Sequence, residues 1–231
     1  LQLVDVATGW SERVAVLGRS YLAMKAAFES VLDRLPFPVR EIHPDNGSEF
    51  LNAHLLRFFQ DTIKGVRLSR SRPYFKNDNR HVEQKNSTLV RRYLGHDRLD
   101  TVAQTKTLNL LYNKMWFYYN FFQPVMHLTE KILVHSEGQA TRIKRRFDRA
   151  QTPFDRLCAT DAISAEERSK FSALRDQTNP RQLRQDIYNL LDHLFDLPPA
   201  SAGHTQDVYH TLPIPLPFTK GADTPVTFSF E

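Results

Sequence analysis

Residues 39–50 read VREIHPDNGSEF and place a carboxylate directly after a short run of strand character. The run over 39–43 predicts a β-strand, because Pro44 and Gly47 mark a turn that ends it. The side chain of Asp45 is therefore expected at the end of a strand. Taken alone, Asp-Asn-Gly is more typical of an ordinary turn than of a reactive site.

The segments on either side of this strand predict an α/β domain with a mixed sheet. Apolar periodicity and turn residues set the expected elements. In chain order these are strands over 1–7 and 12–17, a helix over 20–35, the strand over 39–43, a helix from Asn52 closed by Gly65, a strand over 66–69, and helices over 82–94 and 101–122. Strands that alternate with helices in this way are typical of an α/β fold.

Beyond residue 123 the pattern changes to a basic strand over 142–147 followed by short helices. Helix starts are expected at Thr152-Pro153, at the Ser164 capping box and at Asn179-Pro180. The last helix carries a stripe from Leu183 to Leu194 at coiled-coil-like spacing. This stripe either packs on its own domain, the commoner case, or joins copies of the chain. The proline-rich stretch from Pro198 is predicted to be disordered.

Composition narrows the classes of function. The 231 residues carry a net charge of +5, which favours a polyanionic partner. The lone cysteine, Cys158, excludes a disulfide framework and a cysteine-rich zinc site. No signal peptide or membrane-length apolar run is visible, so the cytoplasm is the expected location. Basic residues gather between residues 64 and 100, at Lys64, Arg67, Arg70, Arg72, Lys76, Arg80, Lys85, Arg91, Arg92 and Arg98.

Residues 77–86 read NDNRHVEQKN and add a second carboxylate, Glu83, in the first turn of a helix. Taken alone, this position suits any glutamate, because the helix dipole favours negative charge there. Two carboxylates joined by a basic, Asn-rich loop match the needs of two-metal phosphoryl transfer. Hard divalent cations prefer carboxylate oxygens, and two of them about 4 Å apart stabilise both reacting oxygens at phosphorus.

The ordered motifs resemble the integrase core of bacterial insertion-sequence transposases and retroviral integrases. The motifs are VDVATGW at 4–10, DNGSEF at 45–50, RPY at 72–74, KNDN at 76–79, VEQKN at 82–86 and YNFFQP at 119–124. The resemblance implies an RNase H-like mixed sheet flanked by helices, followed by a smaller, mostly helical C-terminal region. It divides the chain into a catalytic core over 1–128, a basic and helical region over 129–197, and a tail over 198–231.

By this resemblance Asp45 and Glu83 are the second and third acidic ligands of two Mg²⁺ or Mn²⁺ ions. Asn86 matches a position that supports DNA binding, and Lys76, Lys85, Arg91 and Arg92 are candidate DNA contacts; a solvated helix face is the alternative for the last three of these basic residues. The expected partners are transposon ends, target DNA and further copies of the chain, at the bacterial nucleoid, with no membrane and no small-molecule substrate.

The first acidic ligand of the family is not found. In the family the segment like 4–10 lies on the second strand, so we expect Asp5 to stabilise a turn through backbone bonds rather than to bind metal. The absence of a central first strand would leave unpaired edges. The chain as given is therefore expected to lack nuclease activity and to fold poorly without upstream residues.

Three functions follow from these patterns. The intact protein is expected to be a transposase that cleaves DNA and transfers strands. The alternatives are a catalytically dead remnant that only binds DNA or partner subunits, and a metal-dependent nuclease of the same fold without joining activity.

Overall fold

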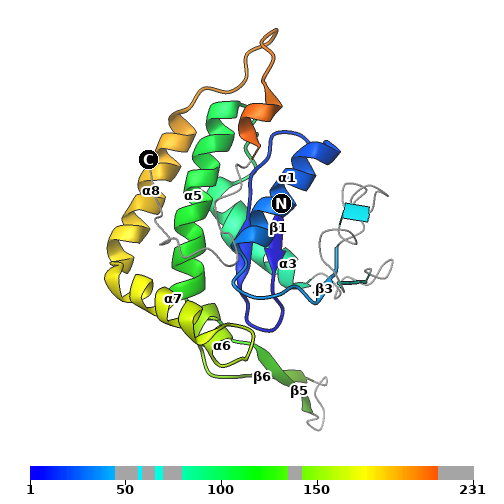
Figure 1. Ribbon diagram of the computed structural model, residues 1–231, viewed down its shortest axis with the longest axis vertical. Coiled ribbons are helices and arrows are strands. Elements are labelled where there is room, and N and C mark those ends of the chain that lie inside the picture. Colours follow the sequence, from blue (N-terminus) through cyan, green and yellow to red (C-terminus); the bar gives the residue numbers. More distant parts are fainter. Residues whose placement is uncertain (45–56, 59–65, 70–79, 135–141, 213–231) are drawn as a thin grey trace.

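The computed structural model describes residues 1–44, 57–58, 66–69, 80–134 and 142–212 (Figure 1). The described part is a mixed α/β structure, as predicted, with three two-stranded sheets. Its elements are β1 (Gln2–Val4), β2 (Ser11–Arg13), α1 (Tyr21–Arg34), β3 (Glu41–Ile42), β4 (Arg67–Leu68), α3 (Arg80–Lys85), the π-helix η1 (Asn86–Arg91), α4 (Arg92–Leu94), α5 (Val102–Phe121), β5 (Leu128–Val134), β6 (Arg142–Phe147), α6 (Pro153–Cys158), α7 (Ala165–Gln177), α8 (Pro180–Asp196) and the 3-10 helix η2 (Val208–Thr211). The predicted helix from Asn52 lies almost wholly outside the described residues, as do Asp45 and Lys76.

The opening hairpin pairs β1 with β2 in antiparallel register, with Leu3 opposite Glu12. Its turn is stabilised by Asp5, whose carboxylate accepts hydrogen bonds from the Thr8 amide at 2.8 Å and the Thr8 hydroxyl at 2.5 Å. The Asp5 amide and carbonyl also bond across the turn, to Trp10 and Gly9. The predicted structural role of Asp5 is therefore confirmed.

Helix α1 packs against two of the small sheets. Its N-terminus is capped by Ser20, whose hydroxyl accepts from the Ala23 amide at 3.2 Å, as the sequence predicts. The buried Phe28 of α1 belongs to a cluster that includes Leu3 of β1 and Ile42 of β3. Strands β3 and β4 are parallel to each other, whereas β1 and β2 are antiparallel. One helix thus covers an antiparallel pair and a parallel pair of strands.

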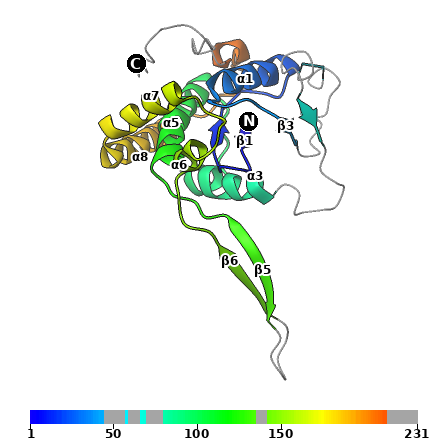
Figure 2. The same ribbon diagram turned by 60° about the horizontal axis from the view of Figure 1, so that its bottom comes forward.

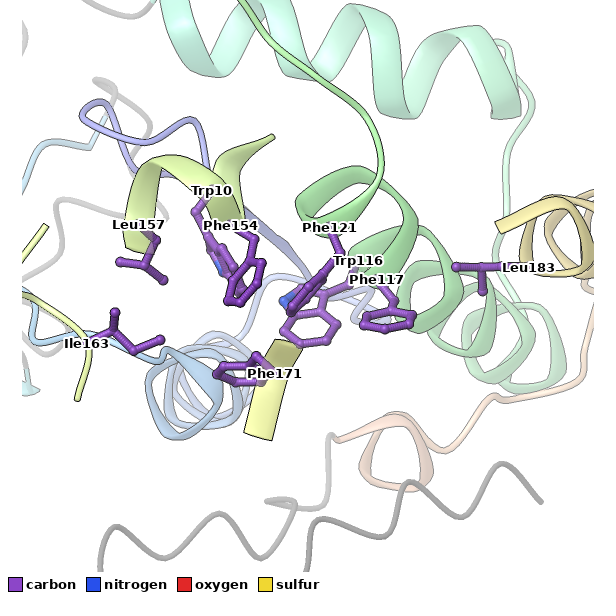
Figure 3. Close-up of a cluster of buried hydrophobic side chains, with 9 residues drawn as sticks. All are labelled: Trp10, Trp116, Phe117, Phe121, Phe154, Leu157, Ile163, Phe171 and Leu183. Carbon is purple, nitrogen blue, oxygen red and sulfur yellow. The ribbon is translucent and has the colours of Figure 1, made fainter. Parts of the chain in front are cut away.

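Helix α5 lies at the centre of the molecule. It begins at a capping box formed by Thr101 and Gln104. Aromatic side chains near its C-terminal end pack with residues of the first hairpin and of α6, α7 and α8 (Figure 3). The buried members of this cluster are Trp10, Trp116, Phe117, Phe121, Phe154, Leu157, Ile163, Phe171 and Leu183. The C-terminal helices therefore share a hydrophobic cluster with residues of the predicted core region.

Helix α8 lies along α5 and buries its apolar stripe there (Figure 1). Leu183, Ile187, Leu191 and Leu194 are all buried in the two clusters that line α5. The interpretation that this stripe packs on its own chain is confirmed. After α8, the helix η2 lies beside α5, inside the stretch over 198–231 for which the sequence predicts disorder.

Strands β5 and β6 form a hairpin that extends away from the helices (Figure 2). The predicted basic strand over 142–147 is confirmed as β6. None of the helices in the described ranges combines the length and the apolar character needed to cross a bilayer.

Candidate active site and nucleic-acid surface

Glu83, the predicted third acidic ligand, lies in α3, which packs beside β1 (Figure 1). Its side chain is exposed and has no hydrogen bond or ion pair to the described part of the chain. The second predicted ligand, Asp45, lies outside the described residues, three positions after the end of β3. Within the described ranges, no three acidic, histidine or cysteine side chains gather as a metal site. The two-carboxylate metal site therefore stays a prediction.

The helix that carries Glu83 changes its winding immediately after Lys85. The sequence predicts one α-helix over 82–94, but residues Asn86–Arg91 form the π-helix η1 between α3 and α4. Buried Leu89 and Leu94 hold this segment against the core, and Gly95 ends it with a φ of 63°. Short π-helical segments are rare and occur frequently at functional sites.

The candidate DNA contacts fall into two groups. Arg91 and Arg92 are exposed and free to meet a phosphate. Asn86 and Lys85 are half-buried. The pKa of Lys85 is lowered to about 8, first by burial and second by the positive charge of Arg13. Lys85 is therefore less accessible to a phosphate than the two exposed arginines.

Arg13 is a buried cation that the sequence interpretation did not single out. It is only 2% exposed, and the Cζ atom of its guanidinium lies 5.9 Å from the ring centroid of Tyr112 and 5.8 Å from that of Tyr119. Among the described residues, no hydrogen-bond partner exists for any of its side-chain nitrogen atoms. Burial lowers the pKa of Arg13 to about 10. The attraction between the guanidinium and the two aromatic rings offsets only part of the free energy that is needed to remove this charge from water.

The face of the hairpin that carries Arg13 concentrates unsatisfied polar atoms. Gln2 stands opposite Arg13 in the strand register, and both polar atoms of its side-chain amide are buried with no partner in the described part of the chain. The hydroxyl of Ser11, two residues from Arg13 on the same face, likewise has no hydrogen-bond partner among the residues that the structure describes. Buried polar groups in proteins are normally hydrogen-bonded, so the unsatisfied groups on this face lower the stability of the fold. The guanidinium of Arg13 makes the same face electropositive.

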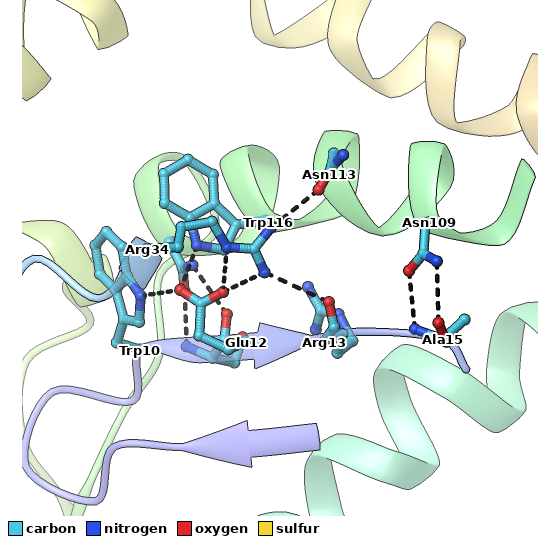
Figure 4. A network of polar contacts seen from close by, with 10 residues as sticks. Trp10, Glu12, Arg13, Ala15, Arg34, Asn109, Asn113 and Trp116 are labelled. Atoms are coloured by element: carbon cyan, nitrogen blue, oxygen red, sulfur yellow. Dashed lines mark hydrogen bonds and ion pairs between the residues drawn. The ribbon is translucent and has the colours of Figure 1, made fainter. Parts of the chain in front are cut away.

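The opposite face of β2 holds a complete polar network (Figure 4). The carboxylate of Glu12 accepts hydrogen bonds from the indole of Trp10 at 2.8 Å and the indole of Trp116 at 2.6 Å. It also forms a buried ion pair with Arg34, whose Nε donates at 2.7 Å. The Nη1 atom of Arg34 donates in turn to Asn113 at 2.9 Å. This network joins β2, α1 and α5.

Asparagines of α5 cover the free edge of β2. Asn120 accepts from the Ser11 amide at 2.9 Å and donates to the Ser11 carbonyl at 3.1 Å. Asn109 makes the same pair of bonds to Ala15, at 2.8 and 3.0 Å. These side chains replace a neighbouring strand, so the edge is closed to further pairing. The recurrence of asparagine along α5 is the sequence feature that would have indicated this role.

No protein-family model matches this chain. The chain is similar to y4rM, an uncharacterized protein of Sinorhizobium fredii (strain NBRC 101917 / NGR234), with 36% identity over 154 residues. The similar stretch covers 67% of this chain and 42% of that relative. The chain thus spans less than half the length of this relative.

The burial of Lys85 predicts an unusual pH dependence of stability. Because the folded-state pKa of about 8 lies below the usual 10.5, the unfolded state binds more protons between these values. The free energy of unfolding is therefore expected to rise from pH 8 to pH 9.5, by about 2 kcal/mol at most. Lys85→Met should flatten this rise when urea unfolding is measured across the range.

The pH range and a matched control make this measurement specific to Lys85. Burial raises the pKa of Tyr112 to about 12, which reduces stability only above the usual tyrosine value of 10, so the window ends below that pH. Lys106→Met, at an exposed position of α5, is the matched control and should keep the wild-type pH profile. A Lys85→Met protein with the same rise as wild type would contradict the assignment.

Proposed function

We propose that this chain is the catalytic region of a metal-dependent polynucleotidyl transferase, a transposase or integrase that cleaves DNA and transfers strands. The proposed fold is RNase H-like. The location of Glu83 carries the proposal: its exposed carboxylate, which no described residue pairs with, lies on a helix beside β1, and Asp45 follows β3 in the sequence. The order of these motifs along the chain supports the same conclusion.

The strand arrangement supports the proposed fold. An antiparallel pair and a parallel pair of short strands share the cover of α1. The backbone bonds between Leu1 and Val14 and between Asp5 and Trp10 define the register of the hairpin. By strand alternation, the backbone groups of Gln2 and Val4 point away from β2. An RNase H-like sheet has its first strand in a central position. A further strand paired with this edge of β1 would take that position.

The two candidate carboxylates suit the proposed metal-dependent reaction. Asp45 and Glu83 are the residues that would hold the metal ions, since both offer the hard oxygen donors that Mg²⁺ and Mn²⁺ prefer. The bound ions would supply Lewis-acid stabilisation of the charge that develops at the reacting phosphate. Exposed Arg91 and Arg92 bind backbone phosphates and hold the DNA strand next to α3. We place this activity in the cytoplasm at the nucleoid, in an assembly of several copies.

Strand transfer by the natural polypeptide that contains this chain tests the proposal. We expect purified protein to join duplex DNA taken from either side of its gene to a plasmid target, in Mg²⁺ or Mn²⁺ and not in EDTA. DNA binding without any cleaved or joined product would identify a binding protein instead. Cleavage without joined product would identify a nuclease. Product formed equally well in EDTA would overturn the metal-dependent mechanism.

A further inference from the structure

The hairpin of β5 and β6, here called the ribbon, is unusual because neither of its faces is buried. All six residues of β6 are exposed, and five of the seven residues of β5 are exposed. The ribbon extends away from the body of the molecule (Figure 2). An isolated two-stranded hairpin is only marginally stable in water, so a surface of this kind is typical of a segment that binds a partner.

The charge of the ribbon points to a polyanion. Its two strands carry five basic side chains and one acidic side chain, a net charge of +4. The single acid, Glu130, is paired with Arg146 at 3.4 Å. The remaining basic residues, Lys131, Arg142, Lys144 and Arg145, have no ion pair within the described ranges. Protein-protein interfaces are depleted of charge at their centres, so a protein partner fits this surface poorly.

The strand register distributes these charges over both faces. Arg142 and Lys144 share one face, on which Lys144 stands opposite Ile132. Arg145 stands opposite Lys131 on the other face, where exposed Ile143 and Leu133 form the next pair. On the first face, basic side chains of β6 therefore stand opposite apolar side chains of β5, and on the second face an apolar pair follows a basic pair. A charged and partly apolar ribbon suits a groove whose walls are phosphates and whose floor carries base edges and methyl groups.

The base of the ribbon is held firmly to the body. Val125 and Gln151 form a backbone bridge with bonds of 2.8 and 3.2 Å. Asp148 accepts from the His127 amide at 2.7 Å and pairs with Arg156 of α6 at 2.7 Å. The turn of the first hairpin also packs here, because a Cβ on Gly9 would lie 3.2 Å from Val125. These contacts give the ribbon a defined direction relative to the core.

We infer that the ribbon is a DNA-binding arm that lies in a groove of duplex DNA and contacts phosphates on both sides. The major groove of B-form DNA is wide enough to admit a two-stranded β-ribbon. This inference deepens the proposed function, on which it rests for the identity of the polyanion. It assigns DNA binding to a surface distant in sequence from Glu83, and it requires neither metal nor cleavage.

Fluorescence anisotropy with a labelled 25-base-pair duplex in EDTA tests the arm on the full-length protein. The variant Arg142→Gln/Lys144→Gln/Arg145→Gln is expected to bind at least tenfold more weakly than wild type in about 0.1 M salt. The slope of log affinity against log salt should fall by about 2 to 3, since each lost phosphate contact removes roughly 0.9. The charge-preserving variant Arg142→Lys/Lys144→Arg/Arg145→Lys should bind within a few-fold of wild type.

The matched control removes three exposed charges from α7 and α8, as Arg168→Gln/Arg181→Gln/Arg184→Gln. It should bind within about threefold of wild type, because it changes net charge equally and spares the ribbon. Equal weakening by both triple variants, or no weakening by the ribbon variant, would overturn the inference. So would wild type that fails to bind duplex DNA, or that binds poly-glutamate as tightly. Ribbon-dependent binding by a protein that transfers no strands would support the arm and refute only the proposed catalysis.

Discussion

Replacing Glu83 with glutamine is expected to slow Mg²⁺-dependent DNA cleavage by the full-length protein about 10³-fold. Glutamine keeps the size of the side chain but replaces an anionic oxygen with an amide. A metal ion contributes several kcal/mol to stabilising the charge at phosphorus, and each 1.4 kcal/mol is a factor of ten in rate. The exposed position of Glu83 makes a large effect on folding unexpected. The measurement is the single-turnover cleavage rate.

The comparison with other variants separates catalysis from binding. Asp45→Asn should produce a loss of the same order, because both carboxylates are proposed to hold the same ions. Glu29→Gln is the matched control, since the side chain of this α1 residue is 41% exposed and pairs with Lys25 at 3.6 Å. DNA affinity in EDTA should stay within about twofold for Glu83→Gln. Cleavage by Glu83→Gln within tenfold of wild type would remove this residue from the metal site.

Replacing Glu12 with alanine is expected to destabilise the fold by about 3–5 kcal/mol, the usual loss when one partner of a buried ion pair is removed. The carboxylate is 1% exposed and satisfies Arg34 and two indole groups at once. Its removal leaves a buried guanidinium without a counter-charge. Natural domains have only about 5–15 kcal/mol of stability, so most of the margin would be lost.

Urea unfolding followed by tryptophan fluorescence measures this effect well, because the two tryptophans of the chain, Trp10 and Trp116, both bond to Glu12. Glu29→Ala should cost less than about 1 kcal/mol, as surface pairs do. The double variant Glu12→Met/Arg34→Met should recover part of the loss, since no charge is then left unpaired. A Glu12→Ala protein as stable as Glu29→Ala would show that the network contributes little.

Helix boundaries in this chain were well predicted because caps depend on a few neighbouring residues. Helices begin after Ser20, Thr101, Thr152, Ser164 and Asn179, and each of these side chains accepts a backbone hydrogen bond within its own first turn. Strand lengths were predicted less well. The strand expected over 1–7 is shortened to Gln2–Val4, because a ladder extends only as far as its partner strand does.

The sequence predicts which residues form the candidate site, and these residues stay a prediction; it did not predict the surroundings of Glu83. The sequence pointed to Glu83 on a helix, and the structure contains that helix. It did not indicate the π-helix that follows Lys85, since a change of winding depends on how Leu89 and Leu94 meet the core. It also missed the burial of Arg13, because a charged residue in a short strand is ordinarily expected on a solvated face.

The sequence by itself determined the α/β class, the helix starts, the basic character of β6 and the two carboxylates proposed for catalysis. These features depend on residues within a few positions of one another. Only the tertiary structure decided that the stripe of α8 packs on α5, that asparagines of α5 close the edge of β2, and that Glu12 meets Trp116. The bond between Glu12 and Trp116 joins residues 104 positions apart, and such a contact exists only when the folded chain brings distant segments together.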